Sequence, residues 1–77
     1  MARYFFDIYD DMVVLDDAGI ELPDLDAARL EAVTAVCEIA KEIIPHDGPS
    51  KDIKVKVRDE RGVVLTAMIN FTVRMGD

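Results

Sequence analysis

The chain has 77 residues, of which 51% are hydrophobic and 32% charged, and its 16 acids against 9 bases give a formal net charge of -7. This length accommodates one sheet, one helix and one core, so we expect a single small domain over residues 1–77. The acidic balance disfavours non-specific binding to nucleic acid or to anionic lipid, because that affinity comes mostly from cationic side chains. A core of this size is marginal on its own, which favours self-association or a protein partner.

Cysteine content and hydropathy bear on the compartment. A single cysteine, Cys37, excludes an intrachain disulfide framework and fits a reducing cytosol. The first residues contain no signal-type apolar region, and no uncharged apolar run reaches membrane-spanning length. These features predict a soluble cytoplasmic domain without a membrane segment.

The chain before residue 24 is predicted to be extended. Arg3–Tyr9 is rich in aromatic and β-branched residues and predicts a strand, with the face that bears Asp7 turned to solvent. A tight turn at Asp10-Asp11 and a second, antiparallel strand from Met12 to Leu15 follow. After a turn that ends at Gly19, Ile20–Leu22 is a short extended piece before the helix.

A helix from Asp24 to Ile44 is the centre of the predicted fold. Asp24 is a suitable N-cap, because its carboxylate can accept from free N–H groups of the first turn, and Pro45 stops the run. At about 100° per residue the apolar positions form two neighbouring stripes, together wider than docking on one surface requires. We predict that the second stripe is an interface, formed by Leu30, Val33, Cys37, Ala40 and Ile44.

Two further strands follow the helix. Residues 52–58 alternate between apolar and charged side chains, residues 59–62 form a hairpin turn, and residues 63–74 alternate again. The order of elements is therefore β-β-α-β-β. We predict an α+β domain in which a four-stranded antiparallel sheet has one helix packed on one face.

The outward side chains of the strand predicted over residues 52–58 form a basic row. Lys54, Lys56 and Arg58 would share the outer sheet face with Phe5 and Tyr9, and aromatic residues beside cations can bind single-stranded nucleic acid. Alternating cations also protect an edge strand from aggregation. Because the net charge is negative and no RNP-like motif is present, we favour the solvated edge and keep nucleic-acid binding as the alternative.

The titratable residues form no recognisable reactive site. Asp10, Asp11, Asp16 and Asp17 lack the spacing of a calcium loop, so we interpret them as solvated turn residues. Cys37 has no activating neighbour and is interpreted as a buried small hydrophobe. There is no phosphate-binding glycine loop, metal-ligand spacing or nucleophile elbow, so we expect no catalytic, cofactor or metal site. An enzyme would require oligomerisation to assemble a site, for example around His46.

Three segments together resemble an uncharacterised family of short bacterial domains. The segments are an R-Y-F-F-D start at Arg3–Asp7, an E-L-P-D-L helix start at Glu21–Leu25, and a V-x-V-x-D-E-x-G hairpin at Val55–Gly62. The resemblance covers nearly the whole chain. It implies a small bacterial α+β domain and no particular activity.

A weaker similarity links the chain to HicB-type antitoxin domains of HicA–HicB pairs. The shared features are an aromatic first strand, a D-x-x-G turn, a P-D-L step and an Ala-rich helix. The matching residues are Asp16, Gly19, Pro23, Asp24, Leu25, Ala28 and Ala32. A P-x-x-P-G-C-type segment before the helix and a C-terminal DNA-binding extension are absent, so the antitoxin role follows from analogy alone. The sequence therefore predicts a non-catalytic module that forms a homo-oligomer, such as a dimer, or binds a protein partner, with nucleic-acid binding as the alternative.

Overall fold

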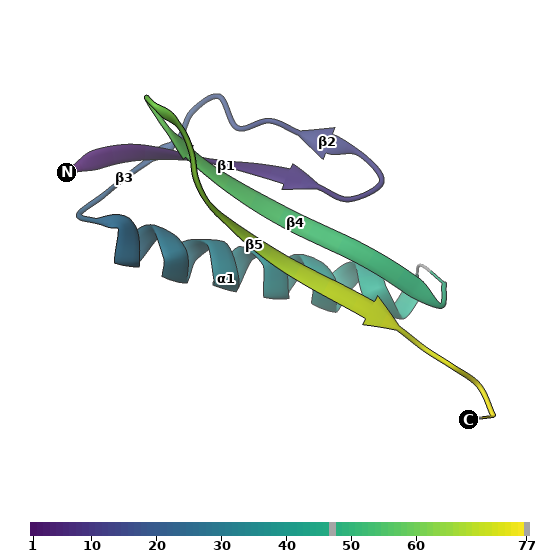
Figure 1. The fold of residues 1–77 in the computed structure, drawn as a ribbon. Coiled ribbons are helices and arrows are strands. Elements are labelled where there is room, and N and C mark those ends of the chain that lie inside the picture. The colour runs from purple at the N-terminus through teal and green to yellow at the C-terminus, as the bar shows by residue number, and fades with distance from the viewer. Residues whose placement is uncertain (47, 77) are drawn as a thin grey trace.

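The computed structural model describes residues 1–46 and 48–76, which form a sheet with one long helix on one of its faces (Figure 1). The elements in chain order are β1 (Ala2–Tyr9), β2 (Val13–Val14), β3 (Ile20–Leu22), α1 (Leu25–Ile43), the short 3-10 helix η1 (Ile44–His46), β4 (Ser50–Asp59) and β5 (Gly62–Thr72). The α+β class and the predicted helix over one sheet face are confirmed.

The sheet is antiparallel, with the strand order β2-β1-β4-β5 and with β3 also paired to β1. It has five strands, one more than predicted, because Ile20–Leu22 pairs with Ala2–Tyr4 at the start of β1. Strand β2 pairs with Ile8 and Tyr9 at the other end of the same edge. One edge of β1 is thus paired with two short strands, β3 at its start and β2 at its end, while its other edge pairs with the central strand β4.

Helix α1 begins and ends where its caps predict. The Asp24 carboxylate accepts a hydrogen bond from the backbone N–H of Ala27 at 2.9 Å, which satisfies one of the free donors of the first turn. The helix gives way to η1 directly before Pro45, whose ring lacks an N–H. The helix therefore presents nineteen residues along the sheet.

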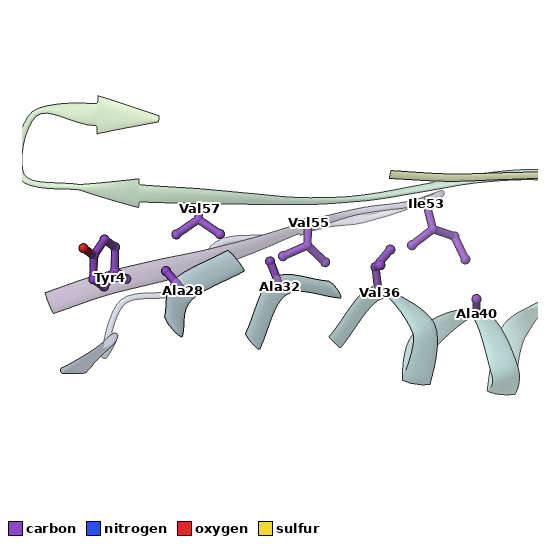
Figure 2. Packing of buried hydrophobic residues seen from close by; sticks show 8 residues of the cluster. All are labelled: Tyr4, Ala28, Ala32, Val36, Ala40, Ile53, Val55 and Val57. Atoms are coloured by element: carbon purple, nitrogen blue, oxygen red, sulfur yellow. The ribbon is translucent and has the colours of Figure 1, made fainter. Parts of the chain in front are cut away.

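The core lies between α1 and the inward face of β1 and β4 (Figure 2). Three β-branched side chains of β4 are completely buried, namely Ile53, Val55 and Val57. They face a row of mainly small helix residues at i, i+4 spacing: Ala28, Ala32, Val36 and Ala40. Small side chains let the helix backbone approach the sheet closely, so the β4 residues fill the space between the layers.

Strand β5 follows the predicted alternation with one irregularity. A register shift pairs Val57 with Leu65 but Arg58 with Val63, which leaves Val64 as the extra residue of a β-bulge. Both Val64 and Leu65 pack against the core as a result, whereas Val63 is 59% exposed. The bulge thus directs two consecutive side chains toward the core, on a strand whose side chains otherwise alternate between the core and solvent.

Candidate interaction surface

The outer edge of the sheet is formed by β5, which pairs with β4 and with no other strand in the described part of the chain. In an antiparallel strand, N–H and C=O groups point alternately to the two sides, so about half of those in β5 face away from β4. Its eleven residues contain no charged side chain and no proline. This strand lacks the usual protections of a sheet edge.

The prediction that Lys54, Lys56 and Arg58 protect a sheet edge is wrong. They lie on β4, which is flanked by β1 on one side and β5 on the other. The predicted alternation of side chains is confirmed, but alternation is the same for an edge strand and for a central strand with one open face. The position of the strand in the sheet could not be derived from it.

An apolar groove of about 380 Å³ runs between α1 and the first half of β5. On the helix side, Leu25, Arg29 and Val33 follow one another at i, i+4 spacing, so their side chains share one face of the helix. Leu65, Thr66 and Ala67 form the strand side, and Asp26 completes the lining. The groove carries one acidic and one basic side chain, and its remaining residues are uncharged.

The predicted interface stripe divides into an exposed part and a buried part. Leu30 is 66% exposed, Val33 is 40% exposed, and Cys37 is exposed one helical turn after Val33. Ala40 is 7% exposed and belongs to the core, and Ile44 packs against it. The inclusion of these last two residues in an exposed stripe is therefore wrong, since the sheet extends far enough along the helix to cover its C-terminal half. The interpretation of Cys37 as a buried residue is also wrong.

We define the β5 flank as the exposed outer edge of β5 together with Leu25, Arg29, Leu30 and Val33 of α1. Large apolar side chains are exposed on it, and the unpaired backbone of β5 lies beside them. The flank therefore combines the two features by which sheet edges recruit other chains, namely backbone hydrogen-bonding groups and adjacent apolar pockets.

The sheet face opposite α1 carries the basic row and the aromatic residues of the alternative hypothesis. The guanidinium of Arg58 lies over the ring of Phe5, 4.7 Å from its centroid, and the Lys56 ammonium lies 4.9 Å from the centroid of Tyr9. Lys54 is the cross-strand neighbour of Tyr9. The predicted residues are thus brought together, but two of the three cations cover the aromatic faces on which a base would stack.

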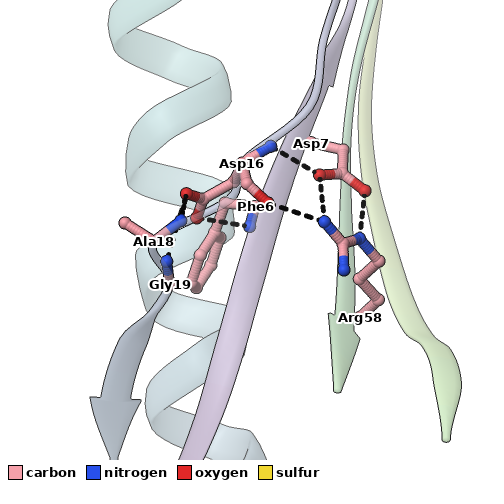
Figure 3. A network of polar contacts seen from close by, with 6 residues as sticks. All are labelled: Phe6, Asp7, Asp16, Ala18, Gly19 and Arg58. Carbon is pink, nitrogen blue, oxygen red and sulfur yellow. Dashed lines mark hydrogen bonds and ion pairs between the residues drawn. The ribbon is translucent and has the colours of Figure 1, made fainter. Parts of the chain in front are cut away.

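Arg58 is also held by two acidic residues at the centre of this face (Figure 3). Its Nε donates to Asp7 Oδ2 at 2.8 Å, and its Nη2 donates to the main-chain oxygen of Asp16 at 2.6 Å. Asp7 is only 3% exposed, so the prediction that this side chain faces solvent is wrong although it lies on the predicted face. The Arg58 side chain and the loop at Asp16 cover it.

Asp16 fills the gap between β3 and β2 along the edge of β1. Its Oδ2 accepts from the Phe6 N–H at 3.1 Å, and its Oδ1 accepts from the N–H groups of Ala18 and Gly19 at 3.0 and 3.1 Å. Its own N–H donates to Asp7 Oδ1 at 2.9 Å. A side chain thereby replaces a strand partner for β1 at this point, and the interpretation of Asp16 as a solvated turn residue is wrong.

The pKa directions agree with this geometry. Burial alone raises the pKa of Asp7, but the hydrogen bond from Arg58, the N–H of Asp16 and the guanidinium charge together outweigh it and lower the pKa below 3.8. Burial acts in the same sense on Asp16, and the three backbone N–H donors outweigh it there, so the pKa of Asp16 is also lowered. The hydrogen bond to Asp7 raises the pKa of Arg58. All three groups are thus held in their charged forms.

Among the other titratable residues, Asp10 stabilises a turn and Asp11 forms an ion pair. Asp10 accepts from the N–H of Met12 at 2.8 Å, and Asp11 pairs with Lys51 at 2.5 Å. His46 is exposed at the end of η1. Across residues 1–46 and 48–76, no three His, Cys, Asp or Glu side chains gather in a way that could hold a metal ion.

The sequence matches one family over most of its length. The family described as Domain of unknown function (DUF6894) matches residues 3–74. The chain belongs to this family. No match was found among the curated proteins or among the solved structures.

Membership of DUF6894 confirms the resemblance to an uncharacterised family of short domains and brings no activity with it. The similarity to HicB-type antitoxins is not shown by this match. No helix within the described ranges has both the length and the apolar character that a membrane crossing demands.

Proposed function

We propose that this DUF6894 domain is a non-catalytic module that associates with a second copy of itself through the β5 flank. The observation that carries this proposal is the position of β5: an uncharged, eleven-residue edge strand lies beside an apolar groove that the chain itself does not fill. A long edge strand of this composition is prone to pair with another chain unless a partner occupies it. Association with a second copy supplies that partner.

Charge favours a second copy as the occupant. The chain carries a net charge of -7, so most of its surface repels another copy. A symmetric contact places a surface against itself, and such a surface must therefore carry no charge or both signs in balance. The β5 strand carries no charge, and the groove beside it carries one acid, Asp26, and one base, Arg29.

The size of the particle as a function of concentration tests the proposal. We expect light scattering coupled to size-exclusion chromatography to give twice the mass of the 8.6 kDa chain at high concentration and a lower average mass on dilution. A mass of one chain up to millimolar concentration would contradict self-association. A stoichiometric complex with a different protein, formed in place of the dimer, would be the outcome that the antitoxin analogy predicts.

Nucleic-acid binding on the open sheet face is the alternative proposal. It is supported by the placement of Lys54, Lys56, Arg58, Phe5 and Tyr9 together on the face that α1 leaves uncovered. Affinity for single-stranded RNA or DNA should then fall steeply with salt, because cations on the protein displace counterions. Binding that is undetectable at low salt would remove this alternative.

The remaining features support a cytoplasmic location in a bacterium as part of the proposal. A lone cysteine, Cys37, is exposed on α1, and an exposed free thiol is compatible with a reducing compartment. The proposed bacterial origin rests on the resemblance of three sequence segments to a family of short bacterial domains.

A further inference from the structure

The β5 flank also constrains how a second copy can be arranged. We infer that two copies join with their β5 strands antiparallel, around a two-fold axis at Thr66, so that the two sheets become one continuous sheet. This inference rests on the proposed self-association and specifies its geometry.

The direction of pairing follows from symmetry. A contact between two identical surfaces is closed by a two-fold axis, and two-fold axes perpendicular to a sheet relate edge strands in antiparallel fashion. Antiparallel pairing of β5 with its copy would satisfy the N–H and C=O groups that face away from β4. Parallel pairing would need a translation, which leaves the two copies unequal and the contact open-ended.

The position of the axis follows from where the groove lies along β5. The groove is lined by Leu65, Thr66 and Ala67, near the start of the strand, and by residues of the first half of α1. Exposed apolar side chains on the same strand, Val63 and Met68, flank Thr66 on either side. An axis at Thr66 places Thr66 opposite its equivalent and Leu65 opposite the partner's Ala67, so the two grooves lie side by side across the axis. An axis near Thr72 would leave the groove outside the contact.

The helices become neighbours in this arrangement. Helix α1 lies over β4 and β5 and runs in the same direction as β5 (Figure 1). A copy related by the axis therefore lays its own α1 antiparallel on the same side of the joined sheet. Each groove lining then carries one acidic residue, Asp26, and one basic residue, Arg29, on the side of the helix that faces the other copy, so the contact has no net charge.

Single introduced thiols test the register. In a Cys37→Ser background, Thr66→Cys places a thiol at the axis, where cross-strand Cα atoms are about 5 Å apart and a disulfide can form. Thr72→Cys is the matched control, because it is the same substitution on the same exposed face of β5. Its two thiols would lie about 40 Å apart, six residues from the axis in opposite directions.

We expect mild oxidation to link Thr66→Cys into covalent dimers and to leave Thr72→Cys unlinked, as judged by non-reducing electrophoresis. The noncovalent dimer of each reduced variant is first verified by light scattering. A reduced Thr66→Cys protein that is dimeric but does not cross-link, or equal cross-linking of both variants, would overturn the register while self-association stands. Monomeric protein throughout would instead overturn the proposed function, and the inference with it.

A pair of charged variants gives a second, independent measurement. Thr66→Glu places two like charges opposite each other at the axis, and within the chain it lies across from Lys56, which favours the folded state. Thr72→Glu adds the same charge away from the axis. We expect the dissociation constant of the dimer to rise at least about tenfold for Thr66→Glu relative to Thr72→Glu. Equal dissociation constants would contradict an axis at Thr66.

Discussion

Arg58 of β4 reaches diagonally across the open sheet face to Asp7 of β1, and the Nε–Oδ2 distance is 2.8 Å. The pair joins the two central strands on the side that α1 does not cover. Asp7 is almost fully buried, and its remaining oxygen accepts from the N–H of Asp16. The ion pair therefore also anchors the loop between β2 and β3 to the sheet.

Replacement of the buried carboxylate should destabilise the fold. Asp7→Asn leaves the Arg58 guanidinium without its charged acceptor, and we expect the free energy of unfolding to fall by about 2 kcal/mol. Urea denaturation measures this change. Asp17→Asn is the control, because Asp17 is exposed and should change stability by less than about 0.5 kcal/mol. Equal effects of the two substitutions would show that the ion pair contributes nothing.

Stability should fall in acid because of the lowered pKa values of Asp7 and Asp16. A carboxyl group with a folded-state pKa below its unfolded value stabilises the protein fully above the unfolded value, here 3.8. That contribution is lost as the pH falls through the folded-state value. We expect the free energy of unfolding to decrease from about pH 5 downwards, with a shallower slope in Asp16→Asn. Slopes that are identical would contradict the role of Asp16.

Gly19 should tolerate no side chain. Its φ is +72°, and an added Cβ would lie 2.9 Å from both Arg3 Cγ and Phe5 Cε2. Gly19→Ala therefore combines the cost of a left-handed backbone, about 1–2 kcal/mol, with a steric overlap. Gly48→Ala isolates the first effect, since Gly48 also has a positive φ but no atom within 4 Å of the added Cβ. Thermal melting should show the larger loss for Gly19→Ala, and the reverse order would contradict the close approach to Phe5.

The small residues of α1 should be intolerant of enlargement. Ala32 is completely buried within the core between α1 and the sheet (Figure 2). Ala32→Leu adds volume to a closely packed layer and should cost about 1–3 kcal/mol in the free energy of unfolding. Thr34→Leu, two residues further on the exposed side of the helix, is the control and should have little effect. A stable Ala32→Leu protein would indicate unfilled space in the core.

The helix and the strands were predictable because caps and side-chain alternation depend only on residues close together in the sequence. Asp24 and Pro45 defined the helix ends, and the alternation over residues 52–58 identified the strand and its faces correctly. The strand order was not predictable, because alternation does not distinguish a central strand from an edge strand. As a consequence, the basic row on β4 was interpreted as edge protection, and the uncharged edge on β5 was missed.

The contacts among Asp7, Asp16 and Arg58 were also not predictable from the sequence. Asp7 and Asp16 are nine residues apart in sequence, and Arg58 is 42 residues from Asp16, so no spacing rule connects them. The pairing of β1 with β4 brings Arg58 to Asp7, and the loop between β2 and β3 brings Asp16 to both. The available signal was the D-x-x-G turn, in which the Asp side chain commonly accepts from the following backbone N–H groups. It pointed to the turn but not to the contact with Phe6.

Sedimentation equilibrium of Val33→Glu beside Thr34→Glu tests whether the β5 flank joins two copies. Both residues are exposed neighbours on α1, and both variants change the net charge from -7 to -8, but only Val33 lines the groove. We expect both proteins to keep the wild-type circular dichroism spectrum. The dimer should dissociate at least about tenfold more readily in Val33→Glu, because a charge is then buried in an apolar contact. Equal dissociation constants for the two folded variants would contradict association through the β5 flank.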